Sequence, residues 1–125
     1  MRLTDYKDKV IHFIAIGGCS MSGLAVLLGK MGFKYIQGSD SAQTKYLAPL
    51  REMGMKIFIG HDAAQVENAE LVVYSAAIGE NNCELKRARE LGVPVLRRDE
   101  LLGWLEQQKV NKAQNENPKI VGSDE

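Results

Sequence analysis

A glycine-rich turn at residues 17–23 is the segment whose residue types and spacing best suit ligand chemistry. It reads GGCSMSG and lies between an apolar run and a segment with helical apolar spacing. Glycines let the backbone approach a ligand closely, and the free N–H groups of a helix N-terminus attract phosphate. The turn therefore predicts a phosphate or diphosphate site, with a tight strand-to-helix turn that binds nothing as the alternative.

The spacing of this turn departs from the dinucleotide fingerprint G-x-G-x-x-G. Gly18 is followed by Ser20 where the middle glycine would stand, and then by Gly23. Ser20 and Ser22 can add hydroxyl donors to a phosphate, although Ser20 can also crowd it. Gly23 is expected to permit close packing of the helix on the sheet, as the last glycine of that fingerprint does.

Further polar or small residues follow the other predicted strands, and so meet the turn at one edge of a parallel sheet. Asp40 can accept from ribose hydroxyls, or form an Asx turn or helix cap. His61 can donate to a phosphate or sugar, or occupy a cap or solvated turn. Asn82 opens a helix, where an N-cap role is sufficient. Residues 75–77 are small enough to admit a flat base or to pack in the sheet.

The elements that must position these residues alternate between strand and helix patterns. Strands are predicted at 10–16, 33–39, 55–60, 70–77 and 93–97, and helices at 21–31, 44–53 and 82–91, with a last helix capped by Asp99. Apolar strands separated by helices predict an α/β fold with a parallel sheet covered on both faces. Right-handed crossovers make this a Rossmann-like, five-stranded parallel sheet.

Composition narrows the function classes. The 125 residues carry 16 Lys+Arg and 16 Asp+Glu, so no basic excess points to nucleic acid or a membrane surface. No apolar run approaches the length of a membrane-spanning helix, and residues 1–10 lack the long apolar stretch typical of a signal peptide. Cys19 and Cys83 form no CxxC motif and the two histidines lack ligand spacing, which disfavours a metal site. We expect a reduced, cytoplasmic protein.

The segments together resemble the N-terminal domain of the Mur ligase family. Within it they are most similar to the branch that adds L-alanine to UDP-N-acetylmuramate in bacterial peptidoglycan (cell wall) synthesis. The resemblance covers about residues 9 to 108. Its motifs are HFIAIGGCSMSGLA at 12–25, GSD at 38–40, GH at 60–61, SAAIGENNCE at 75–84 and VPVLRRDEL at 93–101.

The resemblance implies a Rossmann-like domain at 1–108 that binds the UDP part of UDP-N-acetylmuramate and not a nicotinamide. The implied substrate-binding residues are Gly17, Gly18, Cys19, Ser20, Met21, Ser22, Ser39, Asp40, His61, Ser75, Ala76, Ala77, Ile78 and Asn82. Arg97 and Arg98 follow the fifth strand, so one of them can reach the ligand or a neighbouring domain. Residues 109–125 are expected to form a disordered polar tail or linker.

The resemblance also implies ATP, Mg²⁺ and two further ligase domains, central and C-terminal, in a full-length enzyme. No GK[ST] phosphate loop occurs in these 125 residues, so we expect no catalytic residue here. The chain would be either a fragment of a full ligase or a stand-alone binding domain. The family pattern GIGGxGMSG has glycine where this chain has Ala15, expected inside the first strand and harmless, and Ser20.

Two other function classes are weighed against this reading. One is a small NAD- or nucleotide-binding Rossmann regulatory domain, which Gly18, Gly23 and Asp40 fit but which Ser20 and the segments SAAI and RRDEL disfavour. The other is an interaction module that binds no ligand, which the departures at Ala15 and Ser20 would suit. Binding of UDP-sugar, of NAD or of neither separates the three.

Overall fold

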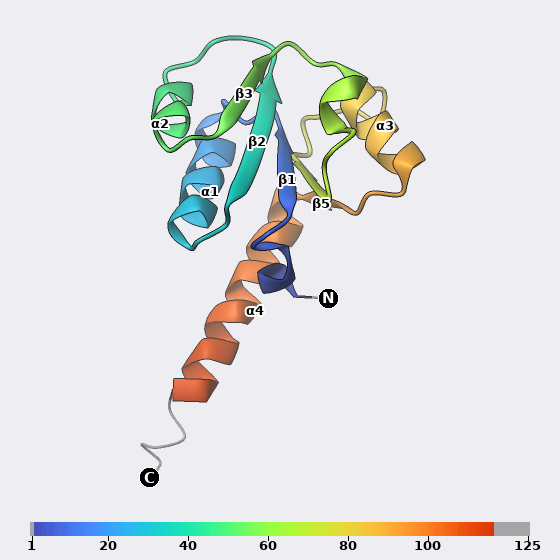
Figure 1. Ribbon diagram of the computed structural model, residues 1–125. Helices are drawn as coiled ribbons and strands as arrows, with labels where there is room; N and C mark the ends of the chain where they lie inside the picture. Colours follow the sequence, from blue (N-terminus) through green and yellow to red (C-terminus); the bar gives the residue numbers. More distant parts are fainter. Residues whose placement is uncertain (1, 117–125) are drawn as a thin grey trace.

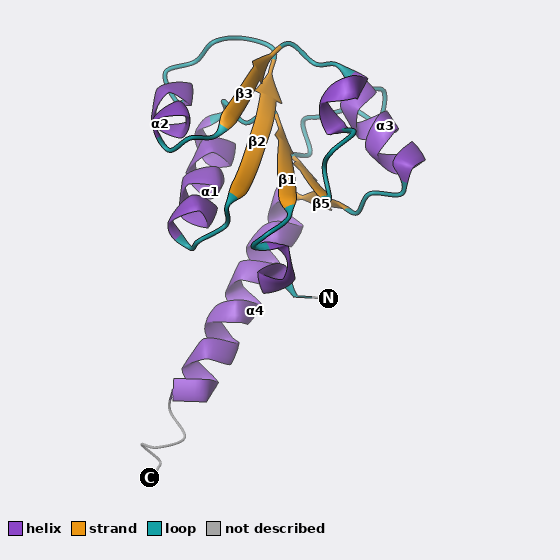
Figure 2. Cartoon of the chain, viewed as in Figure 1, coloured by secondary structure: helices purple, strands orange, loops and turns teal. Residues whose placement is uncertain are grey.

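A five-stranded, all-parallel sheet forms the centre of the molecule, in the order β3-β2-β1-β4-β5 (Figures 1 and 2). The computed structural model describes the backbone of residues 2–116 and the side chains of residues 2–107. The strands are β1 (Val10–Ile14), β2 (Tyr35–Asp40), β3 (Lys56–Ile59), β4 (Leu71–Tyr74) and β5 (Val95–Arg97). The Rossmann-like α/β prediction is confirmed.

Helices cover both faces of this sheet. The elements on one face are η1 (Leu3–Tyr6), α1 (Cys19–Lys30), α2 (Leu47–Glu52) and the first turns of α4 (Arg98–Glu116). On the other face lie η2 (Ala63–Val66) and α3 (Cys83–Leu91). The side chains of β1 alternate between the two faces, with Ile11 and Phe13 toward α1 and Ile14 toward α3, because successive strand residues point to opposite sides.

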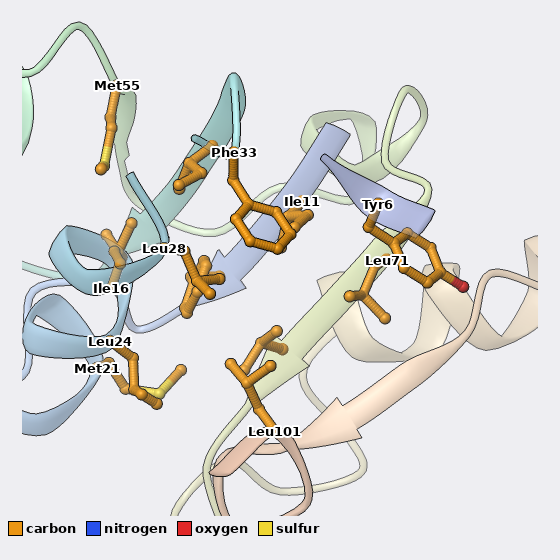
Figure 3. Close-up of a cluster of buried hydrophobic side chains, with 14 of the residues drawn as sticks. Tyr6, Ile11, Ile16, Met21, Leu24, Leu28, Phe33, Met55, Leu71 and Leu101 are labelled. Atoms are coloured by element: carbon orange, nitrogen blue, oxygen red, sulfur yellow. The ribbon is translucent and has the colours of Figure 1, made fainter. Parts of the chain in front are cut away.

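The larger hydrophobic core lies between the sheet and α1, α2 and α4. Figure 3 shows Ile11, Leu28, Phe33, Leu71 and Leu101 gathered in this layer. Each is almost or completely excluded from solvent. Burying a side chain of this size contributes about 1.5–3 kcal/mol, so this layer is what holds the helices at fixed positions on the sheet.

The chain changes direction across the sheet at β1. From β1 it proceeds outward through β2 to β3, and it then returns to place β4 on the other side of β1. In open parallel sheets a ligand crevice forms where the strand order reverses, beyond the carboxyl ends of the strands. The topology therefore places a candidate ligand crevice between the segments that follow β1 and β4.

Three local predictions are wrong. Ala15 does not lie in the first strand, since β1 ends at Ile14 and Ala15 has a positive φ of 67°. Asp99 does not cap the last helix: α4 begins at Arg98, and the Glu100 carboxylate accepts from the Arg97 amide at 2.8 Å. The helix then continues to Glu116, past residue 109, from which the sequence predicts a disordered polar tail or linker. Residues 117–125 lie outside the described residues.

Gly23 also has a different role from the one expected. It is exposed on α1, and a Cβ added there would meet no atom within 4 Å. Close approach occurs instead at Gly38 on β2, where an added Cβ would lie 2.7 Å from the Ile16 side chain and from the Phe13 carbonyl oxygen. Gly38 is thus the glycine that lets the segment after β1 pack on the sheet.

Within residues 2–116, no helix combines the length and apolar character needed to cross a membrane. In the same part of the chain, no three His, Cys, Asp or Glu side chains are grouped as a metal site would require.

Candidate functional site

A surface groove of about 370 Å³ lies at the carboxyl edge of the sheet, between the segments that follow β1 and β4. This is the position at which the strand order reverses. The groove is lined by Ala15, Gly18, Cys19, Ser20, Met21, Ser75, Ala76, Ala77 and Arg98. The structure therefore brings together the glycine turn and the small residues after β4, as their places in the sequence predict.

The N-terminus of α1 opens into this groove without a side-chain cap. Gly18 is the N-cap residue and has no side chain with which to close the helix. Its carbonyl accepts from the Ser22 amide at 2.9 Å. Among the bonds of residues 2–116, none satisfies the amides of residues 19–21. Three free N–H groups and the positive end of the helix dipole thus face a ligand-sized space.

The helix that begins at the same edge after β4 is built differently. The Asn82 side chain caps α3, accepting from the amides of Glu84 at 2.9 Å and Leu85 at 3.2 Å. Its side-chain oxygen is therefore already used, in the N-cap role that the sequence analysis gives as sufficient. Two helix N-termini thus lie at one edge, one closed by its own side chain and the other open.

Asp40 supports the glycine turn from the end of β2. One carboxylate oxygen accepts from the Gly17 amide at 2.9 Å and the other from the Ala42 amide at 3.2 Å. A Cβ on Gly17 would lie 2.8 Å from that carboxylate and 3.0 Å from the Thr44 hydroxyl, which donates to the Gly17 carbonyl at 2.8 Å. Asp40 therefore holds the turn in place through one backbone amide on each carboxylate oxygen.

Arg98 is the only charged residue among those that line the groove. It is the first residue of α4, and its guanidinium donates to the Ser20 hydroxyl on the first turn of α1. Ser20 thus holds a cation beside the three free amides. Ala15 is the lining residue that the sequence does not predict, and Arg98 is one of the two arginines expected to reach the ligand or a neighbouring domain.

The other predicted residues divide between the groove and its surroundings. Met21 both lines the groove and belongs to the core, at 4% exposure. Ser22 is buried, and its hydroxyl donates to the Cys19 carbonyl at 3.0 Å. Ile78 packs against the second core cluster, on the α3 side of the sheet. Asp40, His61 and Asn82 do not line the groove.

A second group of polar side chains lies behind this edge, under α3. Ser39 of β2 is completely buried, and its hydroxyl lies 2.6 Å from a Glu84 carboxylate oxygen and 3.0 Å from Nδ1 of His61. Glu84 is also completely buried and lies 2.7 Å from Nε2 of His12. The sequence does not predict this arrangement, because a glutamate in the first turn of a helix is ordinarily exposed to solvent.

Comparison with known proteins places these motifs in a family context. Residues 10–110 match the family model described as "Mur ligase family, catalytic domain". A UDP-N-acetylmuramate–L-alanine ligase from Persephonella marina is 46% identical over 99 residues, which are 79% of this chain and 21% of that protein. One from Methylobacterium radiotolerans is 49% identical over 105 residues, 84% of this chain and 22% of that protein.

A solved structure agrees with these relatives. The crystal structure of a UDP-N-acetylmuramate–alanine ligase from Thermotoga maritima aligns with a TM-score of 0.71 and 33% sequence identity. The alignment covers 82% of this chain and 23% of that one. The chain thus spans about a fifth of the length of the curated relatives it matches.

Proposed function

Since the chain belongs to the Mur ligase family, we propose that its groove binds the UDP part of UDP-N-acetylmuramate in peptidoglycan biosynthesis. The observation that carries the proposal is the open N-terminus of α1, with Gly18 as a bare cap and Arg98 beside it. A diphosphate needs N–H donors and positive charge together, and this groove offers both. The choice of UDP-N-acetylmuramate as the ligand is inferred from the similar ligases, which are named for that substrate.

In this proposal the diphosphate lies over the first turn of α1. The amides of Cys19, Ser20 and Met21 donate to its oxygens, and the Arg98 guanidinium turns from the Ser20 hydroxyl to the bound phosphate. Residues 75–78 pass beside the nucleoside, where Ala76 and Ala77 leave space for a flat ring. Gly17 and Asp40 shape the turn, so their contribution to binding is to its geometry.

The chain supplies binding and positioning, and we propose no catalytic residue in it. In a ligase that contains this domain, central and C-terminal domains would use ATP and Mg²⁺ to join L-alanine to the muramyl carboxylate. The contribution of this domain to the rate is then to hold the nucleotide end of the substrate at a fixed place. Its partners would be those domains and the substrate.

Calorimetric titration of the chain with UDP-N-acetylmuramate, UDP and NAD tests this proposal. We expect saturable binding of the UDP-sugar, weaker binding of UDP and no binding of NAD. Binding of NAD alone would refute it in favour of a dinucleotide domain. A folded chain that binds none of the three would favour an interaction module.

A matched pair of arginine variants locates the phosphate. Arg98→Gln removes the charge beside α1 and should weaken binding by about tenfold, the lower range for a charge-assisted hydrogen bond at an exposed site. Arg97→Gln removes a neighbouring exposed charge, which pairs with Asp99 at 3.3 Å outside the groove, and should change binding less than twofold, about 0.4 kcal/mol. Equal effects of the two variants would contradict the placement.

A further inference from the structure

Five polar side chains form a continuous hydrogen-bonded network between the sheet and the α3 face. They are His12 of β1, Gln37 and Ser39 of β2, His61 after β3 and Glu84 of α3. All but His61 are buried, and the His61 side chain keeps 22% of its surface exposed. We call this set the Glu84 network. Buried polar groups are costly unless bonded, so the protons in it must be arranged consistently.

Glu84 is the acceptor at the centre of the network. Burial acts to raise the pKa of its carboxyl group, but hydrogen bonds from His12, from Ser39 and from the Asp62 amide at 3.1 Å outweigh burial. The net pKa lies below the ordinary value of glutamate. Glu84 is therefore ionised near neutral pH and can only accept hydrogen bonds.

The tautomer of His12 follows from its two neighbours. The side-chain nitrogen of Gln37 donates to the Gln65 carbonyl at 2.9 Å, which fixes it as the donor end of the amide. That nitrogen also lies 2.8 Å from Nδ1 of His12, so Nδ1 must accept. His12 is then neutral and carries its proton on Nε2, from which it donates to Glu84.

The tautomer of His61 follows from Ser39. The Ser39 hydroxyl has one proton, and at 2.6 Å from an ionised carboxylate it must donate to Glu84. Its oxygen is then an acceptor toward Nδ1 of His61, so that Nδ1 carries a proton. The second Glu84 oxygen, 3.4 Å from the same nitrogen, favours the same arrangement. Nε2, on the other side of the ring, has no hydrogen-bond partner among the described residues.

We infer that Ser39 and Glu84 are positioning residues that hold His61 in the Nδ1–H tautomer and present its Nε2 as a hydrogen-bond acceptor at the carboxyl edge of the sheet. His61 lies outside the groove, so the group that meets this acceptor is a hydroxyl or imide N–H of a sugar nucleotide that extends beyond the groove. This role rests on the proposed function for its ligand, but the tautomer itself does not. Ser39 thus acts on binding through His61, since its own side chain is buried.

Nitrogen-15 NMR of the histidine-labelled full chain at pH 8, without ligand, tests the inference. The two-bond correlations should show a proton on Nδ1 of His61 and on Nε2 of His12. Free neutral histidine prefers the Nε2–H form, so a protonated Nδ1 in His61 requires the network. A His61 ring protonated on Nε2 in the wild-type chain would overturn the inference.

Two variants separate positioning from mere packing. Ser39→Ala removes the nearer acceptor of His61 Nδ1, leaves the Glu84 oxygen at 3.4 Å, and keeps the contact of His12 with Glu84 in place. We expect His61 to shift toward the Nε2–H form while His12 keeps its spectrum. An unchanged His61 in folded Ser39→Ala would overturn the role of Ser39. Glu84→Gln should alter both histidines, and if it does not fold, Ser39→Ala carries the test alone.

Ligand titration then links the tautomer to binding. Ser39→Ala should bind UDP-N-acetylmuramate about three- to tenfold more weakly, as expected for loss of one neutral hydrogen bond. Equal binding by wild type and Ser39→Ala would overturn the link. If the wild type binds no sugar nucleotide but shows the expected tautomers, the proposed function fails and the positioning stands.

Discussion

Replacing Gly18 by alanine separates binding from folding at the centre of the proposed site. The fold does not require glycine here, because φ is −70° and ψ is 155°, which any residue adopts. An added Cβ would meet only the Ala15 carbonyl oxygen, at an ordinary 3.7 Å. It would, however, project from an exposed residue that lines the groove.

The expected change in stability of Gly18→Ala is close to zero. Lower entropy of the unfolded chain stabilises by about 0.4–1 kcal/mol, and alanine is a poorer N-cap than glycine by about the same amount. The net effect is within about 0.5 kcal/mol, a shift in Tm of about 3 °C or less. Obstructing one amide–phosphate contact, in contrast, loses about 1.5–3 kcal/mol, which is about a 10- to 150-fold rise in Kd.

Thermal unfolding and calorimetric titration with UDP-N-acetylmuramate measure the two effects on the same protein. Gly23→Ala is the matched control, since Gly23 is exposed on the same helix, lies outside the groove and has no atom within 4 Å of an added Cβ. It should stabilise the chain by about 0.5–1 kcal/mol and leave Kd unchanged. Wild-type affinity in a folded Gly18→Ala variant would refute the placement of the diphosphate at this turn.

Three further predictions concern other parts of the molecule. Ala15→Gly should stabilise the chain by about 0.5 kcal/mol in thermal unfolding. Relief of the left-handed φ of Ala15 gains about 1–2 kcal/mol, which exceeds the cost of the greater unfolded-state entropy of glycine. As the control, Ala48→Gly at an exposed position of α2 should destabilise the chain by about 0.5–1 kcal/mol. Destabilisation by Ala15→Gly would contradict the left-handed backbone conformation of Ala15. Bound UDP-N-acetylmuramate should slow alkylation of Cys19, because Cys19 lines the groove. Cys83 is the matched control and should not be protected, since it is likewise a free, exposed cysteine at the first position of a helix. Equal protection of the two cysteines, measured by mass spectrometry, would count against the groove. The folded-state pKa of Glu84 is lowered, so its ionisation contributes stability that is present above about pH 4.5 and lost as pH falls. In urea unfolding across acid pH, the free energy of unfolding should therefore fall less steeply with decreasing pH in Glu84→Gln than in wild type. Identical slopes of the free energy of unfolding against pH would contradict an ionised Glu84.

The order of elements could be predicted from the sequence because each apolar run and each helical repeat is long enough to give a clear period. The glycine turn and the small residues after β4 could be predicted to meet for the same reason, since parallel strands bring their carboxyl ends to one edge. The hydrophobic periodicity could not predict the residue at which each strand or helix ends. Ala15 looks like part of a strand, yet it lies in the turn with positive φ.

The contacts that complete the site depend on packing between distant segments. Arg98 is 78 residues from Ser20 in sequence, and only the docking of α4 beside β4 and β5 brings the two together. Glu84 looks like an ordinary charged residue of a first helical turn. Its burial follows from the side of α3 that faces β1 and β2, where His12 and Ser39 supply donors in place of water.

The most direct test of the central claim is a map of backbone amide shifts in the nitrogen-15-labelled chain as UDP-N-acetylmuramate is added. We predict the largest changes at the amides of residues 18–22 and 75–78, with the free N–H groups of Cys19, Ser20 and Met21 moving as expected for bonds to phosphate. Saturating changes confined to other surfaces, or no changes in a folded sample, would contradict the account.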